Sequence, residues 1–278
     1  MPVTHNGVCY RLADAHAHIY PEKIAEKATA SVGGFYGLHM EYVGLPSVLA
    51  ERGGAAGIDR FLVCSVATKV EQVPSINRFI SETCAQYPQF LGLAAWHQEA
   101  EDVPAGLDSI QKLGLRGIKL HPDFQEFHID DPAMLPLYRG AAQRGLPILF
   151  HMGDSRTDFS APIRLARVLD KVPELTCIAA HLGGYTQWKA ARECLKGGQV
   201  YTDCSSSLSF LTPEEARESI AHFGPERVMF GTDFPMWPAG PELRALFALG
   251  LTQAENRGIL FENFARLYRV STQKESHG

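Results

Sequence analysis

The sequence predicts an α/β fold in which eight parallel strands alternate with helices and close into one (β/α)8 TIM barrel. Short apolar segments rich in β-branched residues recur along the chain, and each ends in polar or turn residues. Segments with apolar residues spaced near 3.6 lie between them, as in amphipathic helices. Such barrels commonly form one domain of roughly 250 residues. We therefore expect a single domain over residues 1–278.

The expected strands are short and evenly distributed. They span residues 10–18, 60–67, 90–96, 115–121, 146–151, 175–181, 200–205 and 227–233. Because strands and helices alternate, the strands are expected to run parallel. A doubly wound open sheet is the competing arrangement. The sequence has neither the G-x-G-x-x-G nor the G-x-x-x-x-G-K-[ST] motif that would support it.

Local signals mark the ends of the expected helices. Thr212 followed by Pro213 is typical of an N-cap and a first helical turn. Gly114 and Gly145 are typical residues after a helix end. The expected helices span residues 70–87, 103–113, 132–144, 161–171, 186–195, 213–222, 241–249 and 252–268.

The interval after the first expected strand departs from this alternation. Residues 19–57 are too long for an ordinary loop and are rich in glycine and aromatic residues. We expect an insertion over the C-terminal face of the barrel, where loops shape substrate pockets. Tyr36, His39 and Tyr42 are its candidate pocket residues.

Composition and charge limit the classes of function that the protein can have. With 45% hydrophobic and 21% charged residues, the chain is typical of a globular protein with a large core. A formal net charge of −5 argues against a nucleic-acid-binding surface. No apolar run approaches the roughly 20 residues that cross a bilayer. The expected partner is therefore a small-molecule substrate, not a nucleic acid or a membrane.

Cysteine usage and the N-terminus bear on the compartment. The six cysteines are scattered without a C-x-x-C pair, which agrees with a reducing setting. Residues 1–11 lack the basic and apolar pattern of a signal peptide. A cytoplasmic location is expected. A homodimer is expected because it is the most frequent assembly of soluble proteins.

The end of the first expected strand carries an H-x-H motif. Residues two apart in a strand face the same side, so Asp14, His16 and His18 are expected to share one face. Two imidazoles at one strand end can reach one cation. The alternative is a pair of histidines that are only hydrogen-bonded or exposed there, and the motif alone does not decide between the two.

Three other expected strands end in residues of the same kind, namely His151, His181 and Asp233. In a barrel, the carboxyl ends of all strands meet around one opening. We therefore expect His16, His18, His151 and Asp233 to hold one divalent ion. Three imidazoles and a carboxylate suit Zn²⁺ and also accept Mn²⁺, Fe²⁺ or Co²⁺. Such an ion lowers the pKa of bound water to about 7.

With these residues in place, the sequence resembles the amidohydrolase superfamily, in its amidohydrolase-2 branch of mononuclear TIM-barrel hydrolases and decarboxylases. The resemblance covers nearly the whole chain, and the order of its motifs is more specific than any single motif. The matching segments are Asp14-Ala15-His16-Ala17-His18, Gly117-Ile118-Lys119-Leu120-His121-Pro122, Phe150-His151, Ala180-His181-Leu182-Gly183-Gly184, Gly231-Thr232-Asp233-Phe234-Pro235 and the closing helix from Ile259 to Tyr268.

The resemblance implies roles for the matching residues. His16, His18 and His151 are implied as metal ligands. Asp233 is implied to touch the metal or its water and to act as general base and then acid. His181 is implied to polarise the substrate carbonyl or to orient the water.

Lys119 and His121 share a face of the fourth expected strand. Some superfamily members carry a carboxylated lysine there that bridges two metals. The preferred interpretation is a buried Lys119 paired with Asp14 or Asp203, and a His121 that contacts substrate or only caps its strand end.

Two further residues are substrate-binding candidates. His97 ends the third expected strand, and Arg156 follows His151, where its guanidinium would bind an anionic group. An ordinary loop arginine is the alternative for Arg156.

The predicted function is hydrolysis of a lactone, amide or similar C–O or C–N bond by metal-activated water. The alternative is a non-oxidative decarboxylase of an aromatic or unsaturated carboxylic acid, which uses the same ligands. A decarboxylase is expected to place a cation such as Arg156 near the substrate carboxylate. A third alternative, a barrel that binds metal only structurally, is disfavoured because Asp233 and His181 are present.

Overall fold

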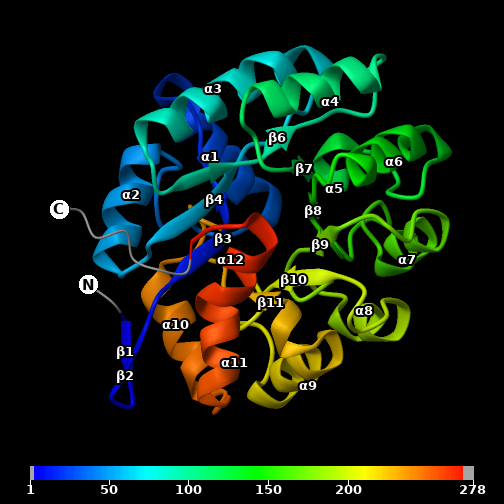
Figure 1. The fold of residues 1–278 in the computed structure, drawn as a ribbon. Helices are drawn as coiled ribbons and strands as arrows, with labels where there is room; N and C mark the ends of the chain where they lie inside the picture. The colour runs from blue at the N-terminus through cyan, green and yellow to red at the C-terminus, as the bar shows by residue number, and fades with distance from the viewer. Residues whose placement is uncertain (1–2, 272–278) are drawn as a thin grey trace.

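The chain folds into a closed ring of eight parallel strands surrounded by helices, as a computed structural model of residues 3–271 shows (Figure 1). Strands next to each other in sequence pair in parallel throughout the ring. The prediction of a (β/α)8 barrel is confirmed. The barrel strands are β3 (Ala13–His18), β4 (Arg60–Cys64), β5 (Phe90–Gly92) continued by β6 (Ala94–Ala95), β7 (Ile118–Leu120), β8 (Ile148–Phe150), β9 (Cys177–Ala179), β10 (Tyr201–Asp203) and β11 (Val228–Met229).

Backbone hydrogen bonds close the ring where the first and last strands meet. The amide of Ala15 donates to the carbonyl of Phe230 at 2.8 Å, and the amide of His18 donates to that of Phe234 at 2.7 Å. These bonds hold the histidine motif of β3 against the segment that follows β11. The residues Gly231 to Asp233 therefore lie beside the H-x-H motif.

The first strand differs from its prediction over residues 10–18. The chain begins instead with an antiparallel hairpin of β1 (Val3–His5) and β2 (Val8–Tyr10), and the barrel strand starts at Ala13. Asn6 and Gly7 both have positive φ, as the tight turn of a two-residue hairpin requires. The hairpin packs on the helix surface, where His5 stacks on Phe247 with ring centroids 4.1 Å apart.

The helices follow the expected order. Most begin and end within two residues of the predicted positions, and the segment 19–57 forms two helices. The helices and helical turns are α1 (Glu22–Tyr36), α2 (Pro46–Ala55), η1 (Val70–Gln72), α3 (Val73–Gln86), α4 (Val103–Lys112), α5 (Pro122–Gln125), η2 (Pro132–Met134), α6 (Leu135–Gln143), α7 (Pro162–Lys171), α8 (Trp188–Cys194), α9 (Pro213–Phe223), η3 (Pro225–Arg227), α10 (Ala239–Ala248), α11 (Gln253–Arg257), η4 (Gly258–Glu262) and α12 (Asn263–Tyr268). Among residues 3–271, no helix has both the length and the apolar character needed to cross a membrane.

The interior of the barrel is filled by strand side chains and by the last helix. Small residues on β3, Ala13 and Ala15, lie in one buried cluster with Phe264 and Tyr268 of α12. The α12 ribbon lies across the ring in Figure 1. The helix therefore supplies the large side chains that these alanines leave room for, and the functional residues are left to the other end of the strands.

Candidate metal and active site

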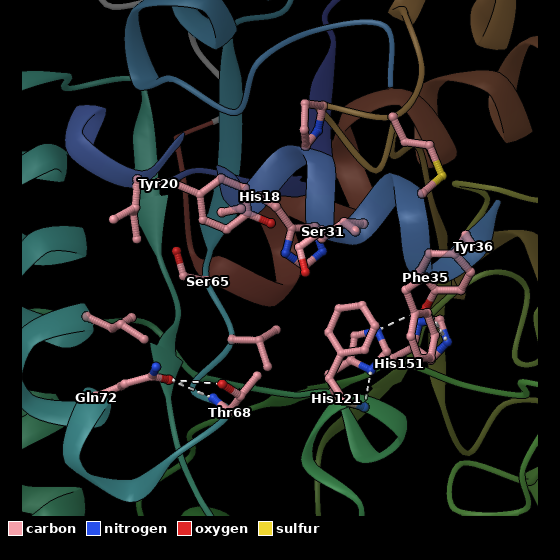
Figure 2. A pocket seen from close by; sticks show the side chains of 18 of the residues that line it. His18, Tyr20, Ser31, Phe35, Tyr36, Ser65, Thr68, Gln72, His121 and His151 are labelled. Atoms are coloured by element: carbon pink, nitrogen blue, oxygen red, sulfur yellow. Dashed lines mark hydrogen bonds between the residues drawn. The ribbon is translucent and has the colours of Figure 1, made fainter. Parts of the chain in front are cut away.

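A cavity of about 590 Å³ opens at the carboxyl ends of the barrel strands (Figure 2). Helix α1, in the first half of the segment 19–57, contributes apolar side chains to its lining, whereas α2 contributes none. Polar groups from several strand ends reach the same cavity. Its lining includes Ile24, Val32, Phe35, Tyr36, Val66, Phe124 and Met236, together with His18, His121, Asp123, His151 and Asp233.

Three predicted ligands converge at one end of this cavity. The Nε2 atoms of His16 and His18 lie 3.1 Å apart. The Oδ1 atom of Asp233 lies 3.6 Å from the first and 3.4 Å from the second. For metal bonds of about 2.1 Å, tetrahedral ligand atoms lie about 3.4 Å apart. The three donor atoms therefore fit around one divalent ion, and we call them the metal triad.

The ring of His16 is held in one orientation. Its Nδ1 lies 3.2 Å from Oδ2 of Asp203, a carboxylate oxygen that only accepts. Burial and the nearby Lys119 lower the pKa of His16 to about 4, so the ring is neutral. Nδ1 therefore carries the hydrogen, and Nε2 offers its lone pair to the metal triad.

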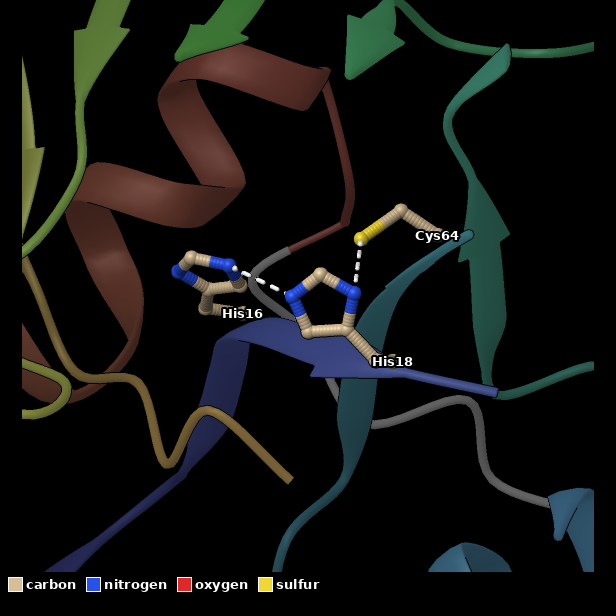
Figure 3. Close-up of side chains that lie close together, drawn as sticks. All are labelled: His16, His18 and Cys64. Atoms are coloured by element: carbon tan, nitrogen blue, oxygen red, sulfur yellow. Dashed lines mark hydrogen bonds between the residues drawn. The ribbon is translucent and has the colours of Figure 1, made fainter. Parts of the chain in front are cut away.

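Cys64 lies next to His18 but on the other edge of the ring, as Figure 3 shows. Its Sγ is 3.7 Å from Nδ1 of His18, whereas Nε2 faces His16. The sulfur also contacts the carbonyl of Ala17 at 3.6 Å. Although His16, His18 and Cys64 are close enough to be counted as one ligand group, the thiol orients His18 instead of completing the triad.

Asp14 does not share the orientation of the two histidines, which differs from the prediction. A register irregularity between Asp14 and Ala17 interrupts the alternation of β3. The Asp14 carboxylate accepts hydrogen bonds from the amide of His16, at 3.0 Å, and from the amide and hydroxyl of Thr232, at 3.0 and 2.5 Å. Asp14 therefore fastens the segment before Asp233 to the histidine motif.

Asp233 occupies an uncommon backbone conformation. Its φ is +54°, and His181 has a φ of +61°. Positive φ in a residue with a side chain costs roughly 1–2 kcal/mol, and such strain is concentrated at functional sites. Burial alone would raise the pKa of Asp233, but His16, His181 and His18 hold it well below its ordinary value. The side chain is therefore an ionised carboxylate.

His151, the fourth predicted ligand, contacts His181, which in turn packs on His16 of the metal triad. Its Nδ1 lies 3.1 Å from Nε2 of His181, whose ring stacks on His16 at 5.0 Å between centroids. On its other side, the His151 ring stacks on His121 at 4.0 Å. The structure thus brings all five predicted strand-end residues to one cluster, while direct ligation by His151 stays a prediction.

Lys119 is buried, as expected, but neither predicted carboxylate is its partner. Its Nζ lies 3.0 Å from Nε2 of His16. Asp14 is engaged by Thr232 and Asp203 by His16, so the predicted pairing is wrong. Burial lowers the pKa of Lys119. Its amine therefore contacts the metal triad directly.

His97 and Arg156 are not among the described residues that line the cavity. His97 is buried, and its Nδ1 accepts the amide of Glu99 at 3.3 Å. The Arg156 guanidinium pairs with Asp154, donates to the carbonyl of Phe35 and lies 4.1 Å from the centroid of that ring. Arg156 therefore anchors the end of α1.

Two carboxylates at the site were given no such role by sequence reasoning. Asp203 ends β10 and orients His16, and the only signal for it was a polar residue at a strand end. Asp123 follows His121-Pro122, lines the cavity and lies 3.8 Å from Nε2 of His151. Its oxygens accept hydrogen bonds from the hydroxyls of Thr157 and Ser160. Partners this distant in sequence leave no local pattern.

Replacing Asp203 by asparagine is expected to weaken metal binding by about 10–100-fold. The asparagine oxygen is needed where Oδ1 of Asp203 accepts the amides of Ser205 and His181, at 3.1 and 3.3 Å. Its NH2 group then faces Nδ1 of His16 and disfavours the tautomer that presents Nε2 to the triad. Titration of the metal-free protein with Mn²⁺ or Zn²⁺ by calorimetry measures this loss. Asp170→Asn on α7, outside the cavity, is the control. Unchanged affinity in Asp203→Asn would show that the carboxylate does not orient the ligand.

Comparison with known families agrees with this geometry. The family described as Amidohydrolase, in its second branch, matches residues 13–270. The chain belongs to the amidohydrolase-2 family. This is a family of metal-dependent enzymes, and the amidohydrolase has His and Asp groups positioned to bind a metal. No curated protein sequence matches the chain.

Solved structures similar to this amidohydrolase include decarboxylases and a hydrolase. The 5-carboxyvanillate decarboxylase of Sphingomonas paucimobilis is 15% identical with a TM-score of 0.72, over 94% of this chain and 99% of that one. A dihydroxybenzoic acid decarboxylase of Polaromonas, with bound manganese and 2-nitroresorcinol, is 15% identical with a TM-score of 0.73, over 97% and 100%. A protein described as a 2-pyrone-4,6-dicarboxylic acid hydrolase, from Pseudomonas putida, is 19% identical with a TM-score of 0.66, over 96% and 100%.

Proposed function

We propose that this amidohydrolase is a metal-dependent, non-oxidative decarboxylase of an aromatic or unsaturated carboxylic acid. The observation that carries the proposal is the metal triad at the end of a cavity with largely apolar walls. Such a cavity suits a planar hydrocarbon ring whose polar end faces the ion. Several structurally similar proteins are decarboxylases of aromatic acids, which supports this choice over the hydrolase predicted first.

The metal is assigned to His16, His18 and Asp233, with His151 as the fourth protein ligand. Imidazole nitrogens and a carboxylate are donors that Zn²⁺ and Mn²⁺ both accept. Zn²⁺ is the choice that the ligand types suggest, whereas one similar decarboxylase contains manganese. When bound, the ion supplies positive charge that holds and polarises the substrate carboxylate.

Residues of the protein carry out the other steps of the reaction. Asp233, as the ionised carboxylate, takes a proton from solvent and delivers it to the substrate carbon. The bond from that carbon to the carboxylate breaks, its electron pair stays on the carbon, and CO₂ leaves. The product therefore carries hydrogen where the substrate carried CO₂⁻. Apolar side chains of α1, Ile24 and Val32 among them, line the cavity and limit access of water.

Hydrolysis of a lactone or amide is the second candidate, and the position of Arg156 favours it. The expected cation at the substrate carboxylate is engaged with Asp154 outside the cavity. No lysine or arginine occurs among the described residues of the lining. In this reaction, Asp233 accepts a proton from water and passes it to the leaving group, and His181 stabilises the oxyanion.

The two reactions are separated by their products. The purified, manganese- or zinc-loaded protein is assayed for CO₂ release from hydroxylated benzoic acids and unsaturated diacids, and for hydrolysis of lactones and amides. We expect CO₂ release that a chelator abolishes and metal restores. Hydrolysis of a lactone or amide without CO₂ release from any acid would replace the decarboxylase with the hydrolase.

A further inference from the structure

Four side chains form a hydrogen-bonded chain across the inner end of the cavity. His181 contacts His151 at 3.1 Å between Nε2 and Nδ1. The Tyr36 hydroxyl lies 3.3 Å from Nε2 of His151 and 3.1 Å from Nε2 of His121. Figure 2 shows Tyr36, His151 and His121 close together at one side of the cavity. The direction in which the hydrogens point along this chain can be derived from its two ends.

At one end of the hydrogen-bonded chain, the contacts of His181 determine the tautomers of His181 and His151. Nδ1 of His181 lies 3.1 Å from the carbonyl oxygen of Ser205, which only accepts. A neutral imidazole carries one hydrogen and offers one lone pair. Nδ1 of His181 therefore holds its hydrogen, and its Nε2 accepts from Nδ1 of His151. The lone pair of His151 is left on Nε2, where it accepts the Tyr36 hydroxyl.

At the other end, the contacts of His121 independently give the same direction of hydrogen bonding along the chain. The amide of Phe124 donates to Nδ1 of His121 at 3.3 Å, capping the first turn of α5. A ring nitrogen that accepts an N–H bond carries no hydrogen of its own, so Nδ1 of His121 is the nitrogen with the lone pair. Its hydrogen therefore lies on Nε2 and points at the Tyr36 oxygen. Both ends agree that Tyr36 accepts from His121 and donates to His151.

The same tautomer excludes His121 as a metal ligand, although His121, Asp123 and His151 form a close group. Its Nδ1 is used by the Phe124 amide, and its Nε2 carries a hydrogen. His151, by contrast, has a lone pair on Nε2, which accepts the Tyr36 hydroxyl. If His151 held the ion through that lone pair, the Tyr36 hydroxyl would no longer donate to it. The Tyr36 hydroxyl is then free to donate elsewhere, with the His121 N–H still beside it.

These two hydrogen-bond donors could bind an anion in a cavity that is otherwise poor in groups able to do so. Its described lining has carboxylates at Asp123, Glu126 and Asp233 but no lysine or arginine. The hydroxyls of Thr157 and Ser160 donate to Asp123 and so spread its negative charge. A phenol ordinarily keeps its hydrogen at neutral pH, so the Tyr36 hydroxyl can donate.

From this geometry we infer that Tyr36 and His121 form a donor pair that binds an anionic oxygen of the substrate in place of an arginine. This inference rests on the proposed function, because a decarboxylase must recognise a carboxylate or phenolate. The donor pair acts through the phenol O–H and the imidazole Nε2–H. Specificity for the anion therefore comes from the end of α1 and from the residue that caps α5, both of which lie against His151.

Benzoate and its uncharged isostere benzamide are the probes for the donor pair. Binding of each to the manganese-loaded protein is measured by calorimetry. Tyr36→Phe removes the hydroxyl alone. His121→Asn removes the Nε2–H but retains an acceptor for the Phe124 amide. Tyr20→Phe is the matched control, because Tyr20 lines the same cavity at the other side of Figure 2.

We expect Tyr36→Phe and His121→Asn each to weaken benzoate binding by about tenfold or more, since a hydrogen bond to a charged group is lost. Because the two donors act together, the double variant is expected to lose little more than either alone. Benzamide binding, and both ligands in Tyr20→Phe, should change less than about twofold. The inference is overturned if wild type does not bind benzoate, or if the variants weaken both probes equally or neither.

The tautomers provide a measurement that does not depend on turnover. Nitrogen-15 spectra of the metal-free protein should show hydrogen on Nε2 of His121 and on Nδ1 of His151 and His181. Hydrogen on Nδ1 of His121 would overturn the donor pair. Failure of the decarboxylase proposal is distinct, because that outcome is absence of CO₂ release while benzoate binding still depends on Tyr36.

Discussion

Replacing Asp233 by asparagine is expected to lower turnover by about 10²–10⁴-fold, the range that general acid–base catalysis supplies. The amide cannot take up and deliver the proton, yet it has nearly the same shape. The hydroxyl of Ser206 donates to Oδ2 of Asp233 at 2.7 Å, and an amide oxygen accepts that bond equally well. The barrel should therefore stay folded while kcat falls.

Glu126→Gln is the control for this substitution. Glu126 is a carboxylate in the lining of the same cavity, but it is exposed and outside the metal triad. The two variants are compared by kcat, melting temperature and metal content. If Asp233→Asn retained near-full turnover with metal bound, the proton role of Asp233 would be wrong.

Removing a histidine of the metal triad is expected to abolish both metal binding and turnover. His18→Ala deletes one of three converging donor atoms, and its side chain is partly accessible, so the fold should survive. His16→Ala should have the same effect on metal content, but it also leaves Asp203 and Lys119 buried without their shared partner. We expect the His16 variant to lose more thermal stability than the His18 variant.

Metal content by mass spectrometry and turnover with added Mn²⁺ or Zn²⁺ measure this prediction. His128→Ala, a histidine paired with Asp158 near the surface, is the control. A His18→Ala protein that binds metal with unchanged affinity and turns over normally would show that the ion lies elsewhere. Chelation of the wild-type protein should reproduce the inactive state.

The convergence of His16, His18 and Asp233 followed from sequence because it depends on a regular property of the fold. Each lies at or just past the carboxyl end of a barrel strand, and in a closed parallel barrel all such ends share one opening. The order of apolar segments and the strand-terminal polar residues were enough for this. Which nitrogen of each ring faces the ion was not visible in the sequence.

What the sequence could not predict depends on partners distant along the chain. Asp14 turns to Thr232 because the irregularity in β3 changes which side it faces, and a two-residue period cannot show that. Arg156 was expected in the pocket, but the end of α1 offers it the Phe35 carbonyl and ring. Tyr36 was only one of three candidates in its segment until its contacts with two histidines were seen.

The placement of α12 has a consequence for how the protein is made. Its side chains Phe264 and Tyr268 fill the space inside the ring, yet they are synthesised after all eight strands. A nascent chain that has released every strand from the ribosome still lacks these two side chains, and the apolar strand residues that pack on them stay exposed. Stable closure, and with it the alignment of the strand ends, therefore waits for the last helix to emerge.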